Sequence, residues 1–117
     1  MWWFIPAFAW MFMIFYLSAQ PTLPGSSAVA VDFFTKKLAH IGVYGALMFW
    51  MIFGFTSGFR RKSSNKQLVL ALILTIAYAC FDELHQSTVI GRTGTLRDVG
   101  YDALGAGICY LVFKRVI

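Results

Sequence analysis

The chain has little charge, few acidic residues and only two cysteines. Of its 117 residues 13% are charged, about half the fraction that is typical of a soluble domain, and 59% are hydrophobic. A mean hydropathy of +0.68 excludes intrinsic disorder, which requires low hydrophobicity and high net charge. Cys80 and Cys109 each lie in an apolar run, so neither a disulfide framework nor a cysteine zinc site is expected. We therefore predict a small all-α integral membrane protein.

Four segments are apolar and long enough, or nearly so, to be transmembrane helices, which need roughly 20 residues. They are expected at about residues 2–17, 38–55, 68–86 and 98–113 of a single domain that covers residues 1–117. No lysine or arginine precedes the first apolar run, so we interpret it as a retained helix and not as a signal peptide. The sequence thus predicts a four-helix membrane bundle.

The net charge of +5 is divided unequally between the two predicted sides of the membrane. One side holds six cations and no carboxylate: Arg60, Arg61, Lys62, Lys66, Lys114 and Arg115. All five acidic residues lie towards the other side. The positive-inside rule makes the first side cytoplasmic, so both termini are expected in the cytoplasm and the protein in a bacterial plasma membrane. Because topology explains the positive charge, no nucleic-acid partner is expected.

Polar residues gather where three predicted helices reach the outer side. Lys36, His40 and Tyr44 recur every four residues and therefore share one stripe of the second helix. Ionisable groups inside a membrane are costly, and their convergence is typical of a functional site. The neighbouring helices contribute Asp82, Glu83, His85 and Gln86 at the end of the third, and Asp98 and Asp102 at the start of the fourth, where Gly105 favours close helix packing.

These residues also carry a family resemblance. The run DELHQSTVIGRTGTLRDVGYDALG at 82–105 resembles the signature of the VanZ-like family, as do KLAH at 37–40 with Tyr44 and LSAQP at 17–21. The resemblance spans nearly the whole chain. It implies a small polytopic membrane protein whose founding member lowers susceptibility to teicoplanin, a lipid-tailed glycopeptide antibiotic, and it implies no established reaction. Asp102 stands where many relatives have asparagine, which adds a negative charge.

We interpret the cluster as an outward-facing site for a lipid-linked or lipid-tailed anionic molecule, such as a membrane lipid or a lipid-linked envelope molecule. Cations would hold its phosphate or carboxylate, while histidines and carboxylates would move protons during hydrolysis or group transfer. The expected catalytic residues are His40, Asp82, Glu83, His85 and Asp98. The expected substrate-binding residues are Lys36, Lys37, Tyr44, Gln86, Arg92, Arg97 and Asp102.

Simpler interpretations stay open. Intramembrane charges usually pair with one another. Such pairing would join Asp98 or Asp102 to Lys36 or Lys37. It would also join Asp82 or Glu83 to Arg92 or Arg97. A non-catalytic factor that binds or shields at the outer leaflet, or a structural helical module, would then replace the enzyme. The oligomeric state, including a homo-oligomer, also stays open.

Metal binding is chemically allowed but not assigned. His40, His85, Glu83 and an aspartate are ligand types that suit zinc, yet no compact motif such as His-Glu-x-x-His is present. We therefore name no metal site, and the cofactor stays unknown.

Overall fold

The computed structural model describes residues 1–19, 29–89 and 96–116, with the side chains of residues 1–19, 34–89 and 96–115. Within these ranges the regular structure is all helical and contains no strand. The elements are a short 3₁₀ helix η1 (Trp2–Phe4) and four α-helices, α1 (Ile5–Ser18), α2 (Val29–Phe55), α3 (Asn65–Ser87) and α4 (Leu96–Val116). The predicted all-α, four-helix architecture is confirmed.

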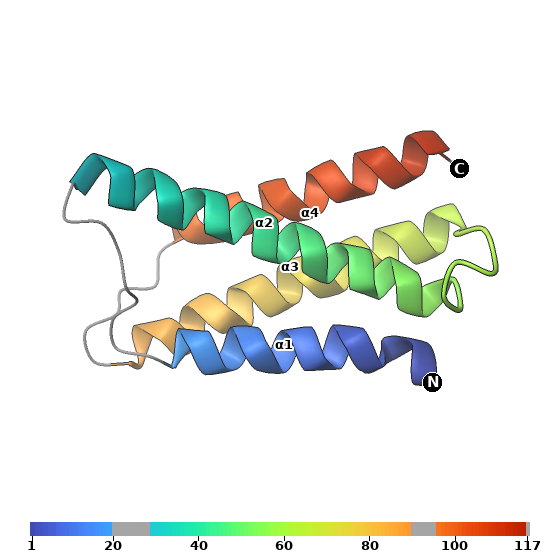
Figure 1. Cartoon of the computed structure of the whole chain (residues 1–117), viewed down its shortest axis with the longest axis horizontal. Coiled ribbons are helices and arrows are strands. Elements are labelled where there is room, and N and C mark those ends of the chain that lie inside the picture. The colour runs from blue at the N-terminus through green and yellow to red at the C-terminus, as the bar shows by residue number, and fades with distance from the viewer. Residues whose placement is uncertain (20–28, 90–95, 117) are drawn as a thin grey trace.

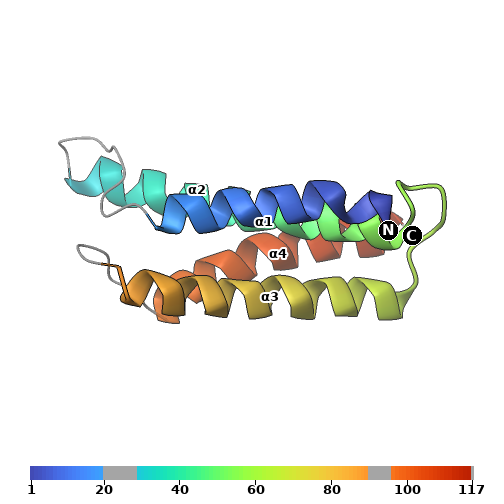
Figure 2. The ribbon, with the colours of Figure 1, turned by 90° about the horizontal axis from the view of Figure 1, so that it is seen from below.

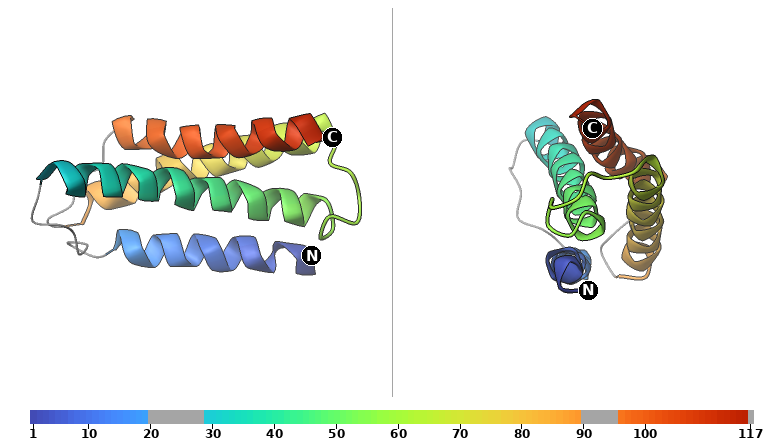
Figure 3. Two further views of the ribbon diagram at one scale, coloured as in Figure 1. Left: turned by 45° about the horizontal axis from the view of Figure 1, so that its top comes forward. Right: turned by 90° about the vertical axis from the view of Figure 1, so that its right-hand side faces the viewer.

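The helices run side by side in an elongated bundle with extents of 45 × 26 × 20 Å (Figure 1). Helix α2 contacts the other three, whereas α1 and α4 make no contact with each other within the described residues and lie on opposite sides of the bundle (Figure 3). Both termini and the connection at 56–64 lie at one end (Figures 1 and 2). At the other end α1 and α3 finish, and α2 and α4 begin.

We name the two ends of the bundle by their charges. The basic end carries Arg60, Arg61, Lys62, Lys66, Lys114 and Arg115, all exposed. The acidic end carries Asp82, Glu83, Asp98 and Asp102. The separation of the charges along the bundle, expected from the four apolar segments, is therefore present in the fold.

Helix boundaries differ from the expected spans most clearly at α2. This helix begins at Val29 and not near residue 38, and α3 and α4 are each longer than 68–86 and 98–113. Apolar runs mark the part of a helix that fits a bilayer, whereas backbone hydrogen bonding continues through polar residues such as Lys36 and Lys37. The first segment also divides, because η1 precedes α1, whose first turn contains Pro6.

A capping box sets the start of α3 just before the expected span 68–86. Ser64 Oγ accepts a hydrogen bond from Gln67 N at 3.2 Å, and Gln67 Oε1 accepts one from Ser64 N at 3.0 Å. Such reciprocal bonds satisfy backbone donors that have no partner inside the helix. Gln67 Nε2 also donates to the carbonyl oxygen of Phe55, the last residue of α2, at 3.0 Å. The turn between the two helices is thereby fixed at the basic end.

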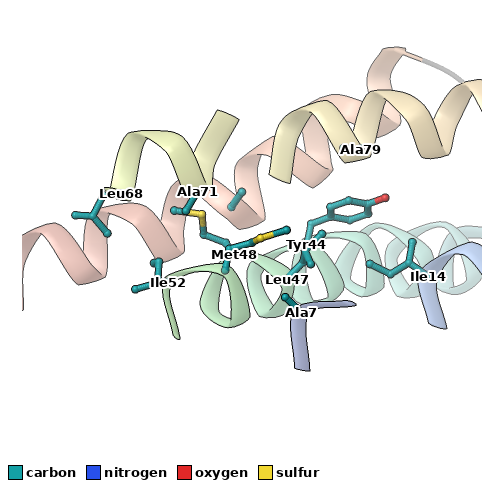
Figure 4. Close-up of a cluster of buried hydrophobic side chains, with 11 residues drawn as sticks. Ala7, Ile14, Tyr44, Leu47, Met48, Ile52, Leu68, Ala71 and Ala79 are labelled. Atoms are coloured by element: carbon teal, nitrogen blue, oxygen red, sulfur yellow. The ribbon is translucent and has the colours of Figure 1, made fainter. Parts of the chain in front are cut away.

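The apolar core lies along the middle of the bundle and is built mainly on α2 (Figure 4). Tyr44, Leu47, Met48 and Ile52 of α2 are almost completely buried and face small side chains on the neighbouring helices. These neighbours include Ala7 of α1, Ala71 and Ala79 of α3, and Ala106 of α4. Small partners let the helices approach closely, so the core positions α2 as the central element of the bundle.

Helices α2 and α4 approach each other closely at Gly105. A Cβ atom at Gly105 would lie 2.1 Å from the carbonyl oxygen of Ile41, and one at Gly45 would lie 3.3 Å from the carbonyl oxygen of Gly105. Only hydrogen fits at position 105, so the expected close approach at this glycine is confirmed. The contact sets His40 and Asp102, one and three residues away, at a fixed separation across the two helices.

Two helical stretches are long and apolar enough to cross a membrane, Phe34–Phe55 and Asn65–Ser87. Trp2–Ser18 is apolar but shorter. Large apolar side chains point outward along the bundle, including Phe8, Phe12 and Leu111, which are 65%, 73% and 61% exposed. So many exposed large apolar side chains in a chain of this size are unusual for a soluble monomer and are typical of a protein whose outer surface meets lipid.

Candidate functional site

Polar side chains of α2 form a ladder of contacts with α3 and α4 at the acidic end. Its three steps follow successive turns of α2. They are the Lys37–Asp98 ion pair, His40 Nδ1 to Asp102 Oδ1 at 2.6 Å, and the Tyr44 hydroxyl donating to Asp82 Oδ2 at 2.8 Å. The ladder thus brings together residues that lie about 40 to 60 positions apart in the sequence, as the intervals of 61, 62 and 38 residues show.

The lysine in this ladder is Lys37, whereas the expected stripe ran through Lys36. At about 100° per residue, Lys37 and Tyr44 are offset by only about 20° around the helix axis, but Lys36 is offset from Tyr44 by about 80°. The structure accordingly leaves Lys36 exposed. It places Lys37 Nζ against Asp98 and 5.0 Å from the centre of the Tyr101 ring. The open interpretation that Asp98 pairs with a lysine of the second helix is confirmed.

His40 and Asp102 form a hydrogen-bonded pair in which His40 is partly exposed and Asp102 is buried. The Asp102 side chain is inaccessible to solvent, and 21% of the His40 side chain is exposed. An ionised carboxylate can only accept, so with Asp102 ionised His40 Nδ1–H donates to it, and in the neutral ring Nε2 then keeps its lone pair. The carboxylate therefore fixes the ring orientation and tautomer of a histidine that can exchange protons or bind a cation through Nε2.

Asp82 is the deepest carboxylate of the third helix. It is 2% exposed and accepts hydrogen bonds from Tyr44 and, at 3.4 Å, from Gln86 Nε2. Gln86 Nε2 also donates to Ser18 Oγ at 3.3 Å, which joins the end of α1 to the cluster. Gln86 thus connects helices in this structure, and its expected substrate contact stays a prediction. Ser18 was missed as a site residue, although it lies in the LSAQP segment that carried part of the family resemblance.

The expected catalytic residues do not all lie together. Asp82 contacts Tyr44 and Gln86, and the other four divide between two places. A ring nitrogen of His40 and carboxylate oxygens of Glu83 and Asp98 lie within 4.8 Å of one another. His85, one of the described residues, does not belong to that group. Its ring stacks on Phe15 of α1, with centroids 4.3 Å apart and planes 12° apart. The structure therefore brings together the histidine of α2 with Glu83 and Asp98, while His85 packs towards α1.

Of the two arginines expected at the site, Arg97 lies within the described residues and Arg92 does not. Arg92 belongs to residues 90–95 and lies outside the described residues. Arg97 is exposed at the start of α4. The cation that the structure places inside the cluster is therefore Lys37, and the expected anion contacts of both arginines stay predictions.

A chemical description of the site follows from these contacts. It contains His40, whose ring is oriented by the buried Asp102, and the carboxylates of Glu83 and Asp98, which have oxygens within 4.8 Å of a His40 ring nitrogen. It also contains Lys37, which lies between Asp98 and Tyr101. Such an arrangement can transfer protons, bind a cation, or present an ammonium group to an anion. It lies towards the acidic end, between α2, the last turns of α3 and the first turns of α4, beside exposed apolar side chains.

Comparison with known protein families gives a match over almost the whole chain. The model of the VanZ/LLP1 family matches residues 3–117, which confirms the resemblance inferred from the sequence motifs. No match to this chain was found among curated proteins or among solved structures.

Proposed function

This chain belongs to the VanZ/LLP1 family, and we propose that it is a multi-pass plasma-membrane protein whose acidic end binds the anionic head group of a lipid-linked or lipid-tailed molecule at the outer leaflet. The observation that carries this proposal is the convergence of Lys37, His40, Glu83 and Asp98 from three helices at one end of the bundle. The apolar tail of the ligand would lie against the exposed apolar surfaces between the two ends.

The proposed orientation places the basic end in the cytoplasm. Six exposed cations at that end, opposite all the described carboxylates, support it through the positive-inside rule. The test is cysteine labelling of Asn65→Cys and Ser87→Cys, both exposed, after Cys80→Ser and Cys109→Ala have removed the native thiols. With a membrane-impermeant reagent added to intact cells, Ser87→Cys should be labelled and Asn65→Cys should not. Labelling of Asn65→Cys alone would reverse the orientation.

Acid–base catalysis is the second candidate, and the His40–Asp102 pair favours it. The Nε2 atom of His40 would take a proton from a water or hydroxyl nucleophile as it attacks a phosphate or acyl centre. It would then return the proton to the leaving group, so the reaction is a hydrolysis or group transfer. Asp102 would act as a positioning residue that stabilises the protonated imidazole. Lys37 would interact with the negative charge that develops on the substrate.

The experiment compares binding with turnover in full-length protein in lipid nanodiscs. Wild type and His40→Gln are measured for binding and cleavage of a polyprenyl phosphate, and for teicoplanin susceptibility in cells at matched membrane abundance. Measured with a metal chelator present, His40→Gln should abolish any cleavage and leave head-group binding within a few-fold of wild type. Binding without cleavage in the wild type would favour the non-catalytic factor that shields the outer leaflet.

The structural alternative has its own readout. If the cluster only joins helices, His40→Gln lowers thermal stability in proportion to any loss of binding or resistance. Full binding and resistance at reduced stability would contradict a functional site at His40.

A separate test concerns Arg92, for which the argument rests on sequence alone. A planar guanidinium beside Gly91 would engage a phosphate through two parallel hydrogen bonds, a geometry that lysine cannot reproduce. Arg92→Lys should therefore fold normally and lose head-group binding. Equal binding by Arg92→Lys and wild type would remove Arg92 from the site.

A further inference from the structure

The acidic end contains three side chains of types that bind metal ions, and no short sequence motif predicts this group. His40 lies on α2, Glu83 on α3 and Asp98 on α4, and their ligand-type atoms lie within 4.8 Å of one another. One imidazole nitrogen and two carboxylate oxygens form a donor set that suits Zn²⁺ or Mn²⁺. Because each donor comes from a different helix, tertiary packing alone creates the group.

A second observation, the contact between His40 and Asp102, also points to a cation. Behind His40, the inaccessible Asp102 carboxylate lies with Oδ1 2.6 Å from Nδ1 of the ring. Histidines that bind metals almost always donate their other ring N–H to such a carboxylate, which fixes the tautomer and makes the ligand more basic. The Asp102–His40 pair therefore has the arrangement of a supported metal ligand, with Nε2 as the donor atom.

The distribution of buried charge at this end supports the same conclusion. Asp82 and Asp102 are 2% and 1% exposed, and Oδ1 of Asp82 and Oδ2 of Asp102 have no hydrogen-bond partner among the described residues. Carboxylates removed from water are costly unless positive charge compensates them. A divalent cation beside His40 would place positive charge next to Asp102, whose Oδ1 lies 2.6 Å from the His40 ring.

We propose that His40, Glu83 and Asp98 bind one divalent transition-metal cation, Zn²⁺ or Mn²⁺, with Asp102 as the positioning residue of His40. The cation takes over neutralisation of Asp98, which releases the Lys37 ammonium group towards the mouth of the site. There the cation and Lys37 together hold a phosphate or carboxylate that the carboxylates alone would repel. The site itself rests on geometry, and only its use in head-group binding rests on the proposed function.

The test measures metal binding without any lipid-linked ligand. Full-length protein, freed of its purification tag, is reconstituted in zwitterionic phosphatidylcholine nanodiscs and titrated calorimetrically with Zn²⁺. We expect one ion per chain. Affinity should fall at least tenfold in His40→Gln and in Glu83→Gln, and by about 10-fold to 100-fold in Asp102→Asn. The matched control is His85→Gln, which alters the neighbouring histidine outside the group and should bind as wild type does.

Electron paramagnetic resonance with Mn²⁺ gives a second readout. Nitrogen hyperfine coupling from an imidazole should be present in wild type and in His85→Gln, and absent in His40→Gln. Circular dichroism and thermal unfolding identify folded variants, and Asp98→Asn replaces Glu83→Gln if the latter does not fold. Absence of Zn²⁺ and Mn²⁺ binding by folded wild type would overturn the proposal. Equal losses in His40→Gln and His85→Gln, or nitrogen coupling that persists in His40→Gln, would overturn it as well.

The outcomes separate this proposal from the proposed function. Failure of metal binding leaves polyprenyl phosphate binding to be measured on its own. A metal site without head-group binding would retain the cation and reject the lipid-linked ligand.

Discussion

The charged side chains at the two ends of the bundle differ in their exposure to solvent. At the basic end six cations are all exposed, and the helices are held by aromatic packing, as in the Trp3–Phe53 contact at 5.9 Å and the Phe59–Phe113 stack at 5.8 Å. At the acidic end Asp82, Glu83 and Asp102 are buried, and polar contacts join the helices.

This difference separates two uses of charge in one small protein. Exposed cations cost little and can orient a chain in a membrane. Buried carboxylates cost several kcal/mol unless they are paired, and their concentration at one end is what the proposed head-group site would require. Small residues and aromatic packing also position α2 against its neighbours.

The largest effect is expected where the acidic end depends on close helix packing. Gly105→Leu places side-chain atoms on the carbonyl oxygen of Ile41, so α2 and α4 must separate. We expect a loss of about 3 kcal/mol, the upper end of overpacking costs, with loss of the His40–Asp102 contact. Thermal unfolding in detergent measures it. Gly107→Ala is the control, since a Cβ there meets nothing within 4 Å. Equal destabilisation by both would mean that packing against Ile41 does not decide the loss.

A smaller effect is expected when one step of the polar ladder is removed. Tyr44→Phe deletes the hydroxyl that donates to Asp82 and keeps the ring in the core, so stability should fall by about 1 to 3 kcal/mol. The same change in the half-buried Tyr110, towards the other end of α4, should cost less than about 0.5 kcal/mol. Urea or thermal unfolding of both variants gives the comparison. If the two variants lose equal stability, the Tyr44–Asp82 hydrogen bond stabilises the protein no more than the hydroxyl of Tyr110 does.

At the basic end the prediction concerns the capping box at the start of α3. Ser64→Ala removes the acceptor for Gln67 N and should destabilise the protein by about 1 kcal/mol. Hydrogen exchange should become faster in the first turn of α3, and metal or ligand binding at the distant acidic end should be unchanged. A change in the site would show that the two ends are coupled.

The smallest effect is expected for a single exposed cation. Arg61→Ala should change stability by less than about 0.5 kcal/mol, because its charge is in solvent. Lys37→Ala, which breaks the ion pair with Asp98, should cost more in the same unfolding measurement. Equal costs would remove the contrast between buried and exposed charge on which the comparison depends.

Much of the site could be predicted because helices impose their own spacing. The residues of α2, the carboxylates near the end of α3 and those at the start of α4 each follow helical periodicity, so their common depth was predictable. The rotation of each helix was not predictable from spacing. An offset of one residue turns a side chain by about 100°, which is why Lys37 and not Lys36 meets Asp98 and why His85 faces Phe15.

The sequence by itself determined the four helices, the separation of cations from carboxylates, and the small residue at the crossing of α2 and α4. These properties follow from local composition and from the 3.6-residue repeat, which need no knowledge of neighbouring helices. Only the tertiary structure decided that His40 pairs with Asp102 and gathers Glu83 and Asp98. The physical reason is that such contacts join segments distant in sequence, whose relative rotation depends on how the side chains of all the helices pack together.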